Sequence, residues 1–155
     1  ADKIFAPNNT VTRAEFAKMI VGAFGIYDTN ATMDFVDTVG AENEWYYKYV
    51  ASAAKRGIIL GYEEDHTFRP TRTISREEMC AIVVRACKAT GRTLVRKHQP
   101  ITFNDDASIM GYAKESVDLM TSAGIIDGMG ENMFVPKGSA TRAQAAKIIY
   151  DVTIG

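Results

Sequence analysis

Three arginines stand at the same position of a motif that occurs three times along the chain. Each follows a Thr or a Ser, and each lies eight residues after the Phe of a Phe-x-Pro triplet. The arginines are Arg13, Arg76 and Arg142, and the triplets begin at Phe5, Phe68 and Phe134. A guanidinium group that recurs at one register of a repeat is a candidate ligand for a carboxylate or a phosphate.

The residues around each arginine predict that it begins an α-helix. Three capping-box patterns precede helical apolar stripes: Thr12 with Glu15, Ser75 with Glu78, and Thr141 with Gln144. A cation at the first helical position is unfavourable by about 0.3–1 kcal/mol, because the helix N-terminus carries partial positive charge. A bound anion, held by Arg and free backbone N–H groups, would offset that cost. An Asp or Glu of a neighbouring repeat would do the same, and the sequence leaves both alternatives open.

A second half-motif occurs twice and carries further candidate residues. It consists of Phe-x-Asp, then an aromatic residue, then Gly-Ile-Ile-x-Gly, and it supplies Asp37 and Asp105, Trp45 and Tyr112, and Gly61 and Gly128. The aspartates are candidates for turn formation or capping, or for accepting hydrogen bonds from sugar hydroxyls. The aromatic residues are candidates for the core or for a flat platform under sugar rings.

Together the two half-motifs define a repeating unit and an all-α fold. Residues 35–90 and 101–155 contain complete units, residues 1–26 contain only the second half of one, and residues 91–100 form a basic linker between units. Shorter helices are predicted at roughly 44–56 and 107–123, each ending at a Gly. Three long apolar stripes of equal length predict a central three-helix bundle with short peripheral helices and loops. The linker is expected to be solvated, with a polyanion contact as the alternative.

Composition and motifs argue against several function classes. The chain has 155 residues and a net charge of −1, whereas a general nucleic-acid binder usually shows a basic excess. No apolar run approaches the roughly 18 residues of a membrane span, and residues 1–5 do not resemble a signal peptide. His66 and His98 lack metal-ligand spacing, and no nucleophile or phosphate-loop motif occurs. We therefore expect no catalysis, no cofactor and no metal, and we expect Cys80 and Cys87 to be small buried hydrophobic residues.

The ordered set of motifs resembles the S-layer homology (SLH) domain. The matching features are the Phe-x-Asp start, the Trp45/Val50/Ala53/Gly57 spacing, Gly-Ile-Ile-x-Gly, Phe-x-Pro, and the signature Thr12-Arg13-Ala14-Glu15 with its two later copies. The resemblance covers nearly the whole chain apart from residues 91–100. It implies a pseudo-threefold trimer of repeats with grooves between adjacent repeats.

The resemblance also implies a function. SLH domains hold exported bacterial proteins at the cell surface by binding secondary cell-wall polysaccharide, often bearing a pyruvyl ketal and linked to peptidoglycan. By position, Arg13, Arg76 and Arg142 would then meet the ketal carboxylate. Asp37, Asp105, Trp45 and Tyr112 would shape the sugar contacts, and Gly61 and Gly128 would allow close backbone approach. The alternative function is a structural module that joins protein to protein in a surface layer, with no saccharide ligand.

Two departures from the family pattern affect the expected grooves. Tyr112 stands where Trp is usual, and Ser75 and Gln144 vary the signature while keeping the capping box. The front half of the first repeat is not part of the sequence, so one groove needs another half-repeat or a second chain to complete it. We therefore predict at most two fully formed grooves.

Overall fold

The computed structural model describes residues 6–155 and confirms the all-α fold. Five helices and two short 3₁₀ turns follow one another, and β structure among these residues is limited to isolated bridges. In chain order they are α1 (Arg13–Phe24), η1 (Val36–Thr38), α2 (Tyr47–Lys55), α3 (Arg76–Ala89), η2 (Asp106–Ser108), α4 (Gly111–Ser122) and α5 (Arg142–Thr153). Phe5, which opens the first predicted Phe-x-Pro triplet, lies outside the described residues.

The three long helices begin where their capping boxes predict. The Thr12 hydroxyl accepts a hydrogen bond from the Glu15 N–H at 3.1 Å, and the Glu15 carboxylate accepts one from the Thr12 N–H at 3.0 Å. The same reciprocal pair forms at the starts of α3 and α5. The shorter helices begin later than predicted, because irregular turns and η2 occupy the residues just before them.

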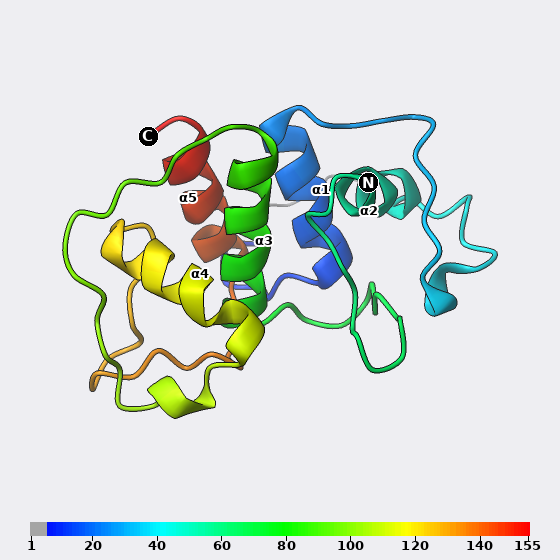
Figure 1. The fold of residues 1–155 in the computed structure, drawn as a ribbon. Coiled ribbons are helices and arrows are strands. Elements are labelled where there is room, and N and C mark those ends of the chain that lie inside the picture. The colour runs from blue at the N-terminus through cyan, green and yellow to red at the C-terminus, as the bar shows by residue number, and fades with distance from the viewer. Residues whose placement is uncertain (1–5) are drawn as a thin grey trace.

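The capped helices α1, α3 and α5 contact one another and enclose the core (Figure 1). Helix α2 packs against α1, and α4 packs against α3, at opposite sides of this central group (Figure 1). The largest fully buried side chains include Phe16, Phe68, Phe134, Ile20 and Met79. Cys80 and Cys87 are buried and free, as predicted, and burial raises the pKa of the Cys80 thiol to about 12.

Backbone hydrogen bonds connect the three helix starts in a closed ring. The N–H of Arg13 donates to the Arg72 carbonyl at 2.8 Å, that of Arg76 to Gly138 at 2.9 Å, and that of Arg142 to Asn9 at 2.9 Å. The next N–H of each helix donates to the carbonyl of a Phe-x-Pro proline: Ala14 to Pro70, Glu77 to Pro136 and Ala143 to Pro7. The first repeat is thereby joined to the second, the second to the third, and the third to the first.

This ring corrects one premise of the sequence analysis. We expected free backbone N–H groups at the helix starts as part of an anion receptor. The first two N–H groups of each helix are instead bonded to carbonyls of the adjoining repeat, and the third is bonded to the capping hydroxyl. An anion at these three helix starts must therefore be bound by side chains.

The basic segment 91–100 lies along helix C-termini. The Arg92 guanidinium donates to the Thr153 carbonyl at 3.1 Å, and that of Arg96 donates to the Ser122 hydroxyl at 2.6 Å. Cations are favourable near helix C-termini, because the last carbonyls carry partial negative charge. The segment is mostly exposed but attached to α4 and α5 through these contacts.

Candidate functional site

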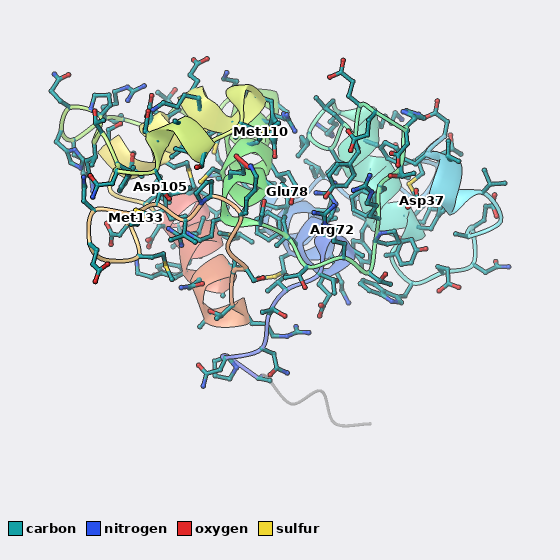
Figure 2. The ribbon with its side chains drawn as sticks, turned by 90° about the horizontal axis from the view of Figure 1, so that it is seen from below. Asp37, Arg72, Glu78, Asp105, Met110 and Met133 are labelled. Atoms are coloured by element: carbon teal, nitrogen blue, oxygen red, sulfur yellow. The ribbon has the colours of Figure 1, made fainter. Side chains whose placement is uncertain are left out.

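A groove with a cavity volume of about 1,070 Å³ lies along α3. Its lining combines Arg13 from the start of α1, the loop 59–73, the side of α3 that carries Glu77, Ala81 and Arg85, and the residues around the start of α4. In Figure 2, Arg72, Glu78 and Met110 of this lining lie in the middle of the molecule, between Asp37 on one flank and Asp105 on the other. Three of the predicted site residues, Arg13, Gly61 and Tyr112, come together in this groove, each from a different repeat.

Arg13 lies at the groove with its charge balanced by a neighbour. Its guanidinium forms an ion pair with Glu78 of α3, and its Nε donates to the Phe68 carbonyl at 2.7 Å. The Tyr62 ring lies 4.5 Å from the guanidinium carbon, and the Tyr62 hydroxyl donates to Glu78 at 2.9 Å. The residue is only 5% exposed, and burial lowers its pKa. Internal pairing, one of the two alternatives left open by the sequence, thus occurs at this position.

The other two signature arginines differ from Arg13 and from each other. Arg142 is partly exposed and pairs with Glu15 of α1. Arg76 is 3% exposed and has no carboxylate partner among residues 6–155, since it donates to the carbonyls of Phe134 and Asp127. Burial lowers the pKa of Arg76 as well. Neither side chain lines the groove along α3.

The two aromatic residues are on the surface, so they do not belong to the core. Tyr112 is 52% exposed and lines the groove, whereas Trp45 is 53% exposed and is not part of the lining. The Lys18 ammonium group lies 5.7 Å from the centre of the Trp45 ring. Trp45 and Arg142 therefore both adjoin α1, the arginine through Glu15 and the Trp through Lys18.

The two aspartates bind backbone amides. Asp37 accepts hydrogen bonds from the N–H groups of Phe68 at 2.8 Å and Arg69 at 2.7 Å. Asp105 makes the same pair of bonds with Phe134 at 2.9 Å and Val135 at 2.8 Å. Arg69 and Val135 have positive φ angles of 60° and 58°, which non-glycine residues rarely adopt. The carboxylates hold these two turns, and neither lines the groove, so their predicted sugar contacts stay a prediction.

The two glycines give room to side chains of the protein itself. A Cβ atom on Gly61 would lie 2.5 Å from the Phe35 ring, and one on Gly128 would lie 2.9 Å from the Phe103 ring. Those two rings come from the Phe-x-Asp motifs and pack against Phe68 and Phe134, with centroids 5.9 and 5.4 Å apart. Gly61 also lines the groove, whereas Gly128 does not.

Several groove residues escaped the sequence analysis. They are Tyr62, Arg69, Arg72, Glu77, Arg85 and Lys137. The repeat alignment hides them because the equivalent positions carry other residue types; for example, Arg85 corresponds to Gly22 and Asp151. The available signal was a departure from the repeat, namely arginines confined to one unit.

Glu77 fixes the side of the groove that carries Tyr112. It is buried, it accepts a hydrogen bond from the Met110 N–H at 2.9 Å, and it pairs with Lys137. Met110 is the residue before α4, and its side chain offers no cap, so the Glu77 carboxylate satisfies an N–H group just ahead of the helix. Within residues 6–155 there is no cluster of potential metal ligands and no helix long and apolar enough to cross a membrane.

The family comparison matches the repeats described above. The family model for the S-layer homology domain matches residues 1–17, 34–80 and 102–146, which together make up most of the chain. The chain belongs to the S-layer homology family. This SLH region is therefore a non-catalytic anchoring module, and membership implies anchoring to the cell wall at the cell surface.

Known relatives contain this region as a small part of a longer protein. The chain is 40% identical over 149 residues to an amylopullulanase of Thermoanaerobacterium thermosulfurigenes and to exoglucanase XynX of Acetivibrio thermocellus. It is 30% identical over 147 residues to the S-layer protein sap of Bacillus anthracis. These matches cover 94–96% of the chain but only 8%, 13% and 17% of the three relatives, respectively. The catalytic names describe those longer proteins.

Proposed function

We propose that this SLH module anchors an exported bacterial protein by binding pyruvylated secondary cell-wall polysaccharide in the groove along α3. The main support for this proposal is that Arg13, Gly61 and Tyr112, from three different repeats, line one groove of about 1,070 Å³. Such a volume suits a short saccharide. The exposed Tyr112 ring offers a face for a sugar ring, and the guanidinium groups of the lining, which include Arg69, Arg72 and Arg85 besides Arg13, offer donors for a ketal carboxylate.

One complete set of these residues occurs in the described part of the chain. Each set consists of a signature arginine, a glycine of Gly-Ile-Ile-x-Gly and an aromatic residue from three different repeats. Arg142 and Trp45 both adjoin α1, but no described glycine completes their set. Arg76 contacts the Asp127 carbonyl beside Gly128, but no described aromatic residue of the half-motif completes that set. The limit of at most two fully formed grooves stays a prediction. We accordingly expect one saccharide to bind per chain.

The proposal is tested by calorimetric titration with purified wall polysaccharide, before and after chemical removal of the pyruvyl groups. We expect binding at one site per chain and its loss on depyruvylation. Equal binding to both preparations would remove the ketal from the proposal. A surface-layer module that only joins protein to protein would bind neither preparation and would instead self-associate in sedimentation experiments.

The exposed Tyr150 on α5 supports the prediction that a further half-repeat completes the first unit. Val21 of α1 and Val84 of α3 are buried at the register where α5 carries Tyr150, which is 57% exposed. Helices α2 and α4 pack on α1 and α3, and an equivalent helix on α5 would cover Tyr150. Slower hydrogen exchange along α5 in a longer piece of the parent protein would support this, and unchanged exchange would contradict it.

A further inference from the structure

Two arginines of the groove, Arg72 and Arg85, have no acidic partner among residues 6–155. Both line the cavity, and neither forms an ion pair or a side-chain hydrogen bond with a described residue. The other three cations of the lining are each paired with a carboxylate: Arg13 with Glu78, Arg69 with Glu64, and Lys137 with Glu77. The one lining carboxylate outside these pairs is Glu63, which is exposed. The groove therefore holds uncompensated positive charge on Arg72 and Arg85.

The two arginines line the same groove and both lie near its tyrosines. The guanidinium carbon of Arg72 lies 5.3 Å from the Tyr62 ring centre, and Arg85 projects from the part of α3 that lines the groove. Burial raises the pKa of Tyr112, and the charges of Arg13, Arg85 and Arg72 oppose that rise. The Tyr112 hydroxyl thus lies within the electrostatic reach of both unpaired arginines.

We infer that Arg72 and Arg85 receive the acid group of a saccharide bound in this groove, while Arg13 is held as part of its wall by Glu78. The inference rests on the proposed function of the groove and names its charge-recognising residues. It follows from the closed ring of backbone bonds, which occupies the amides at the helix starts, and from the ion pairs, which leave two arginine side chains of the lining without a carboxylate. The positions equivalent to Arg72 carry Asn9 and Gly138, and those equivalent to Arg85 carry Gly22 and Asp151. Since none of these four residues is a cation, this recognition belongs to one groove only.

The test compares two double variants of the whole chain that have the same net charge. Arg72→Gln/Arg85→Gln removes the two groove charges that lack an acidic partner, and Arg56→Gln/Lys88→Gln removes two exposed cations elsewhere that form no ion pair with a described residue. The probes are pyruvylated wall polysaccharide and a methyl hexopyranoside with a 4,6-linked pyruvyl ketal, each beside its ketal-free form. We expect the first variant to lose at least about 100-fold in affinity for the acidic probes, about tenfold per charge-assisted contact. We expect the control variant to stay within about twofold.

Each outcome separates the inference from the proposed function. If the wild-type protein binds polysaccharide and both double variants bind equally well, the inference is wrong and the proposed function stands. If the wild-type protein binds only the small acidic glycoside, and the groove variant loses it, the inference stands without wall anchoring. If neither probe binds the wild-type protein, both fall. Thermal melting of each variant checks the fold, and Glu63→Gln, which removes the remaining carboxylate, is expected not to weaken binding.

Discussion

The guanidinium of Arg13 at the start of α1 pairs with Glu78, the carboxylate that also closes the capping box of α3. One Glu78 oxygen accepts from the Ser75 N–H at 3.2 Å, and the other accepts from Arg13. Glu15 serves the N-terminus of α1 and Arg142 in the same two ways. One carboxylate therefore caps its own helix and fixes the start of another.

The Arg13–Glu78 pair is expected to stabilise the fold more than its counterpart does. Arg13→Ala would leave Glu78 buried without its cation, and losing one partner of a buried pair costs about 3–5 kcal/mol. Arg142→Ala removes a more exposed pair and should cost about 1 kcal/mol or less. Urea denaturation of the two variants measures both losses, and equal losses would contradict the structural role assigned to Arg13.

The capping residue of α5 is the neutral Gln144, whereas those of α1 and α3 are glutamates that also pair with an arginine. Gln144→Glu should supply the missing charge. The position that carries Glu78 in α3 and Glu15 in α1 carries Gln144 in α5, and the buried Arg76 has no carboxylate partner among the described residues. A glutamate keeps the capping box and suits the positive end of the helix. We expect a gain of about 1 kcal/mol in the free energy of unfolding. Glu15→Gln, the reverse change at the equivalent position, should lower it, and a destabilised Gln144→Glu variant would reject this pairing scheme.

The sequence was sufficient to predict the helices, because their signals are local. Capping boxes, a period of 3.6 residues and a terminal Gly all lie within one element, and α1, α3 and α5 begin where these signals predict. The contacts between repeats were not predictable in this way. Nothing within four residues of Glu15 shows that its second oxygen pairs with Arg142, which is 127 residues away.

The site was predictable only as far as the repeat carries it. Alignment of the units identified Arg13, Gly61 and Tyr112, which line the groove, but it treated all copies as equivalent. The structure makes them unequal, because Arg76 and Trp45 lie outside this groove. Alignment also discards residues that occur in one unit, which is why Arg72 and Arg85 were missed.

Asp105 should contribute stability to the fold that is lost at acid pH. Burial opposes the shift, but the N–H groups of Phe134 and Val135 lower the pKa of Asp105 below its ordinary 3.8. Since the folded pKa is below the unfolded one, the contribution is complete above about pH 4 and is lost as the pH falls through the folded pKa. Asp105→Asn should therefore cost about 1 kcal/mol at pH 7, with a smaller difference from wild type below pH 4.

Urea unfolding as a function of pH measures the Asp105 contribution. The exposed Glu42, which forms no ion pair with a described residue, provides the control variant Glu42→Gln, whose stability should follow the wild type at every pH. A difference between wild type and Asp105→Asn that stays constant into acid would show that ionisation of this carboxylate is irrelevant to the turn it holds.

Gly61 should not tolerate a side chain, because its environment excludes a Cβ atom. Its φ angle is +74°, and a Cβ would lie 2.5 Å from the Phe35 ring and 2.9 Å from the Thr67 carbonyl oxygen. Gly61→Ala is therefore expected to cost about 2–4 kcal/mol, from overpacking and from the left-handed backbone. Gly22, in the interior of α1 with open space around it, is the matched control, and Gly22→Ala should gain up to about 1 kcal/mol. Similar thermal melting temperatures for the two variants would contradict the close approach of Phe35.

Tyr112 and Trp45 occupy one repeat position but should differ in binding. Both rings are about half exposed, so replacing either by Ala should change the melting temperature by only about 2 °C. Tyr112 lines the complete groove, and Tyr112→Ala should weaken binding of pyruvylated wall polysaccharide about tenfold, the loss typical of an aromatic contact residue. Trp45 lies beside Lys18 instead, and Trp45→Ala should change the affinity less than about twofold. Equal losses would show that the surface beside α1 also binds saccharide, and unaltered binding by Tyr112→Ala would exclude its ring as the sugar platform.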